Sequence, residues 1–345
     1  MKNTKILGVN TLDIKEAAMA LKKGKTVVFP TETVYGLGAN GLCTDAVKNI
    51  YRAKGRPSDN PLILHVAEYS WIEKLARNIP QELNVLFNTF WPGPLTVVLE
   101  ANTDIIPSVT LGGLDTVAIR IPGHPLAIEL LKEADVPVAA PSANSSGRPS
   151  PTEFEHVLED LDGKVDYIIR ASGTEIGIES TVLDLTGYIP KILRPGSLTY
   201  EELREVIELE PYEEHIGGPV LSPGVKYRHY QPKATMEVFI GDDSKTVEKM
   251  KERIGEINKT NQFKNIGILC YEENIAEFPP SYNIISMGPR SDLKTLANSL
   301  YNSLRKFDAL GVEYIISQGI EKPQGLGIAI MNRLMKACGN NIHKV

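Results

Sequence analysis

A short stretch of the chain, residues 26–65, combines cations with hydroxyl-bearing side chains. Lys54 and Arg56 lie around the end of a predicted helix, and Thr31 and Thr33 lie in a glycine-rich turn, residues 30–41, before it. Cations and hydroxyls on loops at strand ends are well suited to binding phosphate oxygens. We therefore predict an anion-binding site for a nucleotide or another phosphate.

Each of these groups also has a purely structural interpretation. Lys54 and Arg56 would favour the dipole of a helix C-terminus even if they were fully solvated. Thr31, Thr33 and Tyr35 alternate, so they could share one face of an extended segment or form hydrogen bonds within their own turn. Spacing alone does not choose between the two interpretations.

Two further arginines lie where a charge needs a partner. Arg120 falls inside an apolar strand, and Arg194 precedes Pro195 at another strand end. A buried charge is costly unless it is paired. Each arginine should therefore meet an anion, which is either a ligand or an internal Asp or Glu. Ser142 and Asn144 follow the end of a third apolar strand. This position alone is a weak signal of a binding site.

Helical and strand periodicities alternate over residues 1–210. They predict an α/β domain with a mixed sheet. Thr11 and Thr44 are predicted helix caps, and Thr152 with Glu155 is a predicted capping box. Helices are expected at 11–23, 44–55, 68–76, 81–88 and 125–134 and from 152 and 199, and strands at 26–29, 62–66, 95–101, 116–121, 136–140, 166–170, 180–185 and 191–193.

The rest of the chain predicts a linker and a second domain. Residues 211–234 contain four prolines and three glycines and show no sustained periodicity, which is typical of a linker. Residues 235–345 again alternate, which predicts a small doubly wound, Rossmann-like domain. Strands are expected at 235–240, 266–270, 283–286 and 314–317, and helices at 244–258, 292–307 and 328–337.

Composition excludes several classes of function. Residues 1–234 hold 23 Lys+Arg against 30 Asp+Glu, which argues against a bulk nucleic-acid binder. The 3 cysteines lie far apart, which makes disulfides and a cysteine zinc site improbable. No apolar run approaches the roughly 20 residues that span a bilayer, and the start lacks a signal-peptide core. A cytoplasmic location is the default expectation.

P-loop, GxGxxG and GxSxG motifs are absent from the sequence.

Taken together, several short motifs resemble the signature of the YrdC-like family. The linker and the Rossmann-like tail resemble the long, two-domain form of that family, the threonylcarbamoyl-AMP synthases. The resemblance covers essentially the whole chain. The motifs that carry it are Pro30-Thr-Glu-Thr-Val-Tyr-Gly-Leu37, Lys54-Gly-Arg56, Pro141-Ser-Ala-Asn144, Ser180-Thr-Val and Ser222-Pro-Gly-Val-Lys-Tyr-Arg-His-Tyr230.

The resemblance implies a twisted mixed sheet with a concave site, over which the linker closes. It implies a cytoplasmic enzyme that condenses L-threonine, bicarbonate or CO2, and ATP into threonylcarbamoyl-adenylate and releases pyrophosphate. Mg²⁺ would arrive on the ATP phosphates, with no ligands from protein side chains. A separate transferase would move the threonylcarbamoyl group to adenosine in tRNA.

The resemblance also implies roles for individual residues. Lys54 and Arg56 would be catalytic, and Asn144 would complete the paired motifs on the nucleotide side. Contacts to threonine are implied for Thr33, His65, Arg120, Ala140 and Ser180. Contacts to the nucleotide are implied for Arg56, Asn60, Thr116, Ser142, Ser150, Arg194 and Tyr230.

The chemistry implied by the resemblance brings anions together, so cations should neutralise charge at the transferred phosphate. No residue is an obvious covalent nucleophile, and we expect catalysis by positioning and electrostatics.

Two rival functions stay open: an RNA-binding module that uses the concave face, and a carbamoyl-transfer component of metalloenzyme maturation. The chain lacks the zinc-finger and acylphosphatase-like modules expected for the latter.

Overall fold

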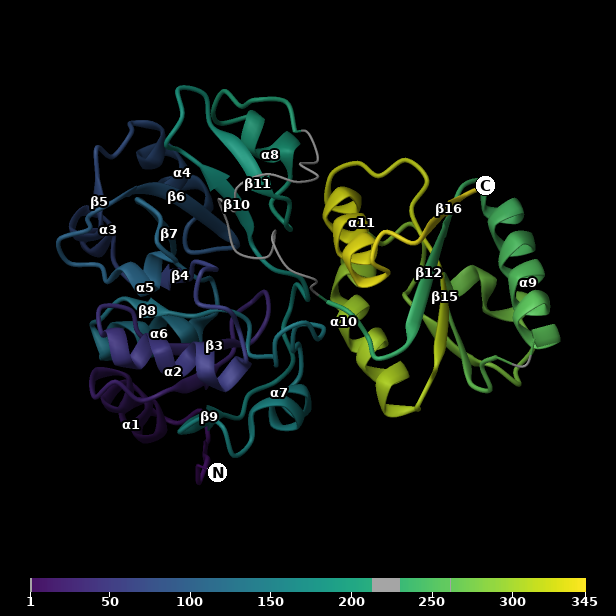
Figure 1. Cartoon of the computed structure of the whole chain (residues 1–345). Coiled ribbons are helices and arrows are strands. Elements are labelled where there is room, and N and C mark those ends of the chain that lie inside the picture. The colour runs from purple at the N-terminus through teal and green to yellow at the C-terminus, as the bar shows by residue number, and fades with distance from the viewer. Residues whose placement is uncertain (1, 213–229, 261) are drawn as a thin grey trace. The chain divides into compact units, whose positions relative to one another are not determined.

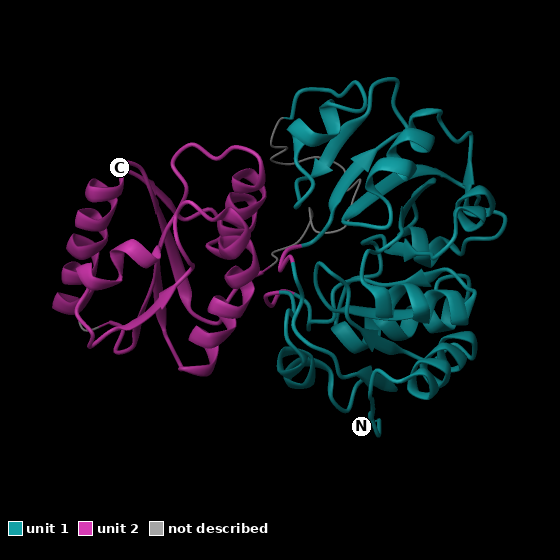
Figure 2. Ribbon diagram, turned by 180° about the vertical axis from the view of Figure 1, so that it is seen from behind, with its two compact units in different colours: residues 1–146, 150–175, 179–227 teal, residues 147–149, 176–178, 228–345 magenta. Residues whose placement is uncertain are grey.

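The computed structural model describes residues 2–212, 230–260 and 262–345. It contains two compact units (Figure 2): unit 1 is 1–146, 150–175 and 179–227, and unit 2 is 147–149, 176–178 and 228–345. The boundaries expected at 210 and 234 stay predictions. Most of the expected linker, residues 213–229, lies outside the described residues.

Unit 1 is built on an 11-stranded mixed sheet (Figure 1). Its order is β1-β9-β2-β3-β8-β4-β7-β6-β10-β11, and β5 pairs with β6. The expected mixed α/β sheet is confirmed, because parallel and antiparallel pairs occur together. The strands are β1 (Lys5–Leu7), β2 (Val27–Phe29), β3 (Gly36–Asn40), β4 (Ile63–His65), β5 (Ala76–Arg77), β6 (Leu95–Ala101), β7 (Thr116–Arg120), β8 (Val138–Ala139), β9 (Tyr167–Ile169), β10 (Thr181–Asp184) and β11 (Lys191–Arg194).

The helices of unit 1 bury apolar stripes against this sheet. Ile14 and Leu21 of α1 and Leu130 of α6 share one core cluster with Phe29 of β2, whereas Ile50 of α2 belongs to the other, larger cluster. The helices are α1 (Thr11–Lys22), α2 (Thr44–Lys54), α3 (Tyr69–Leu75), α4 (Glu82–Phe90), α5 (Ser108–Leu111), α6 (Pro125–Ala134), α7 (Phe154–Leu161) and α8 (Tyr200–Arg204).

Several local predictions for unit 1 were wrong. Residues 36–40, expected as turn, form β3 antiparallel to β2; sheet pairing overrides the low strand propensity of glycine. Asn10, not Thr11, caps α1. Cys43 precedes α2 without a side-chain cap. The capping box of α7 joins Glu153 to His156, one residue beyond the predicted pair, because the chain enters the helix one residue later.

Unit 2 is a parallel five-stranded sheet with the order β14-β13-β15-β12-β16. The predicted small doubly wound domain is confirmed, with one strand, β16, that the sequence did not reveal. The strands are β12 (Thr235–Ile240), β13 (Ile266–Cys270), β14 (Asn283–Ser286), β15 (Tyr314–Gln318) and β16 (Ile342–Lys344), and the helices are α9 (Asp243–Thr260), η1 (Glu272–Glu277), α10 (Leu293–Ala309) and α11 (Leu326–Ala337).

The three cysteines are free; Cys270 and Cys338 are buried and Cys43 is half-buried. Among the helices in the described ranges, none has the length and apolar character required to cross a membrane.

Candidate active site

Three neighbouring strands of unit 1 position most of the predicted site residues. β4 and β7 run parallel with His65 opposite Arg120, and β8 runs antiparallel to β4 with Val138 opposite His65. Thr116 begins β7 and Arg120 ends it. At roughly 3.3 Å per residue the two ends of β7 are about 13 Å apart. The strands therefore present two groups of predicted residues, one at each end.

Lys54 organises the first end. Its Nζ donates to the backbone carbonyls of Ser142 and Asn144, the latter at 2.6 Å, although 88 and 90 residues separate the partners in sequence. The hydroxyl of Ser142 donates to Asn144 Oδ1 at 2.5 Å. Gly55 ends α2 in the left-handed conformation at φ 63°. The helix end thus holds the loop that leaves β8, and Lys54 is buried, contrary to the solvated interpretation.

Asn60, Arg56 and Thr116 lie at this end of the strands. Asn60 is fully buried, and its amide nitrogen and oxygen have no hydrogen-bond partner among the described residues. Arg56 donates to the carbonyl of Pro61 at 3.4 Å, and Thr116 lies at the start of β7, at the same end of the β4–β7 pair as the residues that lead into β4. A buried amide without a partner is costly, so a ligand is the natural partner for Asn60.

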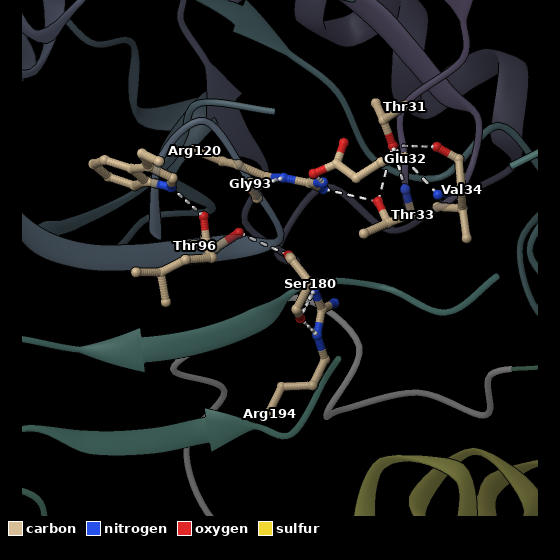
Figure 3. Close-up of polar contacts among 11 residues, drawn as sticks. Thr31, Glu32, Thr33, Val34, Gly93, Thr96, Arg120, Ser180 and Arg194 are labelled. Carbon is tan, nitrogen blue, oxygen red and sulfur yellow. Dashed lines mark hydrogen bonds and ion pairs between the residues drawn. The ribbon is translucent and has the colours of Figure 1, made fainter. Parts of the chain in front are cut away.

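Arg120 organises the opposite end, as Figure 3 shows. Its guanidinium donates to Glu32 Oε1 at 2.6 Å, to Thr33 Oγ1 at 2.9 Å and to the carbonyl of Gly93 at 3.3 Å. Arg120 therefore meets an internal carboxylate, which was one of the two alternatives that the sequence left open. Arg120 lowers the pKa of Glu32 against the effect of burial, which raises it. Contact between Arg120 and threonine stays a prediction.

Thr33 forms a hydrogen bond within its own turn, which is one of the two alternatives left open for this segment. Its hydroxyl lies 2.8 Å from the Thr31 hydroxyl, which itself donates to the carbonyl of Val34 at 2.7 Å. The locally bonded turn is thus present for Thr31. Thr33, in addition, accepts from Arg120, which places it in the site.

His65 ends β4 opposite Arg120, and Ala140 follows the end of β8. His65 is buried, and burial, followed by the nearby charge of Arg120, lowers the pKa of its imidazole to about 3. His65 is therefore neutral near pH 7, and it can exchange hydrogen bonds with a ligand without adding charge. Ala140 donates its backbone N–H to Ile63 at 3.0 Å, so its small side chain is fixed beside β4.

Ser180 and Arg194 form a third cluster, in which Thr96 takes part (Figure 3). Arg194 donates to the carbonyl of Ser180 at 2.9 Å and to its hydroxyl at 3.2 Å. The Ser180 hydroxyl also lies 2.8 Å from that of Thr96. These contacts follow from the pairing of β10 with β6 and β11.

The remaining two predicted residues have separate surroundings. Ser150 is buried and donates to Glu179 Oε1 at 2.6 Å. Tyr230 belongs to unit 2, where its ring centroid lies 5.2 Å from that of Tyr301 and its φ is 66°. The expected contacts of both residues with a nucleotide stay predictions.

Sequence reasoning missed Glu32, Thr96 and Glu179 as partners of site residues. Glu32 lies inside the motif at residues 30–37, which was the available signal. Thr96 and Glu179 gave none, because their partners are distant in sequence.

The charged side chains of the site are compatible with a metal ion that is carried in by a ligand. Within the described ranges, no group of three or more His, Cys, Asp or Glu side chains could hold a metal ion. The carboxylates of Glu32 and Glu179 are engaged with Arg120 and Ser150. The residues present would therefore be compatible with a Mg²⁺ ion whose ligands come from the phosphates of a bound nucleotide.

The chain is similar over nearly its whole length to known proteins. Residues 19–196 match the family Sua5_yciO_yrdC, described as telomere recombination, and residues 198–339 match the C-terminal domain of threonylcarbamoyl-AMP synthase. Relatives named threonylcarbamoyl-AMP synthase include one from Pyrococcus abyssi, 45% identical over 96% of both chains, and one from Bacillus subtilis, 44% identical over 97% of this chain and 96% of the relative.

A solved structure agrees with these relatives. The crystal structure of P. abyssi Sua5 complexed with L-threonine has a TM-score of 0.91 and 43% identity, and it covers 99% of this chain and 100% of the other. Both domains are thus present in one chain in the family's order. The chain belongs to the Sua5/YrdC family, in its long form with a threonylcarbamoyl-AMP synthase C-terminal domain.

Proposed function

We propose that the chain is a threonylcarbamoyl-AMP synthase that condenses L-threonine, bicarbonate or CO2, and ATP and releases pyrophosphate. The observation that carries this proposal is its near-complete overlap with a homologue complexed with L-threonine. The proposal includes its class, a nucleotidyltransferase, since AMP is transferred to an acyl oxygen.

Threonine would bind at the end of β7 that holds Arg120. Its carboxylate can compete with Glu32 for the Arg120 guanidinium, which is suited to a two-point grip on a carboxylate. Glu32, once displaced in part, can accept from the threonine ammonium. Thr33, Ser180 and neutral His65 supply hydrogen bonds, and Ala140 leaves room for the backbone of the amino acid.

ATP would bind at the opposite end. Asn60 offers an amide without a partner, and Thr116, Arg56 and the loop that Lys54 holds lie on the same side. Ser142, Asn144 and Ser150 would complete this half, and Arg194, which contacts Ser180, would reach the phosphates from the Arg120 end. The two ends of β7 are roughly 13 Å apart. Threonine and ATP, bound at opposite ends, would therefore meet and react between them.

The bond changes need no enzyme-bound intermediate. The threonine ammonium first loses a proton to solvent. The free amine then adds to the carbon of CO2 with loss of a second proton, or to bicarbonate with loss of water, and gives a carbamate. A carbamate oxygen then attacks the α-phosphorus of ATP, the bond from that phosphorus to the bridging oxygen breaks, and pyrophosphate leaves. Lys54, Arg56 and Arg194 would hold the phosphates and neutralise charge in the transition state.

Mg²⁺ belongs to this proposal as a companion of ATP. When bound to the phosphates it would screen their charge and favour departure of pyrophosphate. The protein residues would orient the phosphates and exclude water. The product would pass to a separate transferase that modifies tRNA, and stable binding of nucleic acid by this chain is not expected.

Pyrophosphate release tests the proposal. It should require threonine and bicarbonate together. Equal release after rigorous removal of either substrate would refute it. With carbamoyl phosphate in place of threonine and bicarbonate, no turnover is expected; efficient turnover would favour the maturation role. Binding of tRNA with a steep salt dependence would instead favour the RNA-binding role.

A further inference from the structure

A polar cavity lies in unit 2 at the carboxyl ends of its parallel strands. It has a volume of about 310 Å³ and is lined in part by Asp243, Thr246, Tyr271, Arg290 and Gln318. Open parallel sheets bind ligands in the crevice outside the carboxyl ends of their strands. β12, β13 and β15, which lead into this cavity, are neighbours in the sheet.

The floor of the cavity is a preformed hydrogen-bond network around Asp243. Its Oδ1 accepts from Asn274 Nδ2 at 2.8 Å and from Gln318 Nε2 at 3.1 Å, and it is ion-paired with Arg290. Gln318 is buried, and its Oε1 accepts from the backbone N–H of Tyr271 at 3.0 Å. Asp243 is thus held by two buried amides, Asn274 and Gln318, and it pairs in turn with the guanidinium of Arg290.

Thr246 contributes a buried hydroxyl to the lining of the cavity. This residue is 2% exposed and lines the cavity. Its hydroxyl has no hydrogen-bond partner among the described residues. A buried hydroxyl without a partner costs free energy, so its position beside Asp243 and Arg290 indicates a ligand with a complementary polar group.

The charges of the lining restrict the class of that ligand. Carboxylates come from Asp242, Asp243 and Glu321, and cations from Arg290 and Lys322. A phosphate or nucleotide would face three carboxylates, whereas a purely cationic ligand would face Arg290. In the described part of the chain, no cluster of His, Cys, Asp or Glu could hold a metal ion. A zwitterion meets both signs of charge at once.

We propose that this cavity binds a free α-amino acid. Its ammonium contacts the second oxygen of Asp243, its carboxylate contacts Arg290, and its polar atoms hydrogen-bond to Thr246. The volume, at the lower end of the roughly 300–1,000 Å³ of small-molecule pockets, favours a ligand of this size. The inference does not rest on the reaction proposed for unit 1.

Hydrogen–deuterium exchange on the full chain tests this proposal, with each proteinogenic amino acid added singly at millimolar concentration. At least one should protect residues 241–246 and 318–322, a readout confined to unit 2. Its affinity, measured by calorimetry, should fall at least about tenfold in Arg290→Met and roughly threefold to tenfold in Thr246→Val. Lys249→Met, which removes an exposed cation from α9, should bind normally.

Three outcomes would overturn the proposal. One is that no amino acid protects these segments. Another is that protection and affinity are unchanged in both cavity variants. A third is that inorganic phosphate alone protects the segments while amino acids do not. Threonine binding at the proposed active site does not confuse the result, because protection there falls in unit 1.

Discussion

Arg120 illustrates how a buried charge remains ambiguous in a sequence. Apolar neighbours showed that the guanidinium needs an anion, but they did not name it. The structure pairs it with Glu32 across 88 positions of sequence. Under the proposed function the same two side chains would have to separate in part to admit a threonine carboxylate and ammonium, so their pairing would affect both stability and substrate affinity.

Replacing Arg120 with Met should lower the free energy of unfolding by about 3–5 kcal/mol, because it leaves Glu32 buried without its counter-ion. Chemical denaturation measures this loss. The double variant Arg120→Met/Glu32→Gln should regain part of it. Arg77→Ala, which removes an exposed arginine paired with Asp104, should cost less than about 1 kcal/mol. Equal losses for Arg120 and Arg77 would contradict this assignment.

The division of ligands between the two ends of β7 is tested by steady-state kinetics. Arg56→Ala should raise KM for ATP about tenfold or more and change KM for threonine little, because it removes a charged hydrogen bond at one end. Arg120→Lys, which keeps the charge beside Glu32, should do the reverse. If both variants lost the two substrates equally, the division would be wrong.

The lowered pKa of His65 makes the stability of the fold depend on pH, and it sets the direction of that dependence. Its pKa is about 3 in the fold against 6.5 as the ordinary value, so between these pH values the unfolded chain holds a proton that the folded chain lacks. Stability should therefore fall as the pH drops below about 6.5, by up to about 1.4 kcal/mol per unit. Denaturation of wild type and His65→Gln at pH 7.5 and 5.5 isolates this contribution from that of Glu32. An identical pH dependence in both proteins would contradict it.

At the scale of elements, hydrogen bonds join the end of α2 to the loop after β8. Gly55 stops the helix in a left-handed conformation, which places Lys54 inside and Arg56 beyond the turn. The hydrogen bonds from Lys54 then fix residues 142–144. The position of residues 142–144, which are proposed to contact the nucleotide, thus depends on how one helix ends.

Lys54→Met should raise KM for ATP at least about tenfold and increase hydrogen exchange in residues 141–146, because the carbonyls it holds lose their donor. Lys48→Met provides a matched control on the same helix, since Lys48 is exposed beside Asp45. Normal exchange in the Lys54 variant would show that the loop is held by other contacts.

At the scale of the whole molecule, Tyr230 tests whether the segment between the domains serves the reaction. Tyr230→Ala should speed release of ATP while unit 1 stays folded, as expected if the segment closes over the site. Stopped-flow release of a fluorescent ATP analogue measures this, with circular dichroism as the folding control. Tyr230→Phe, which keeps the ring against Tyr301, separates packing from the hydroxyl. Unchanged release in Tyr230→Ala would reduce its role to packing within unit 2.

The sequence by itself determined the elements whose cause is local. Apolar periodicity placed α6, β6, β12, β13 and β14 with the bounds that the structure has, and Gly55 marked the end of α2. The resemblance of short motifs, combined along the chain, indicated the family. Such features depend on neighbours within a few residues, so one sequence contains them.

Only the tertiary structure decided which distant groups meet. β3 exists because its glycine-rich backbone pairs with β2 and β8, and the pairings of Lys54 with residues 142–144 and of Ser180 with Thr96 follow from strand order. The counter-ion of Arg120 and the cavity of unit 2 have the same origin. Contacts across dozens of residues depend on how the sheet is assembled, and no local pattern encodes that order.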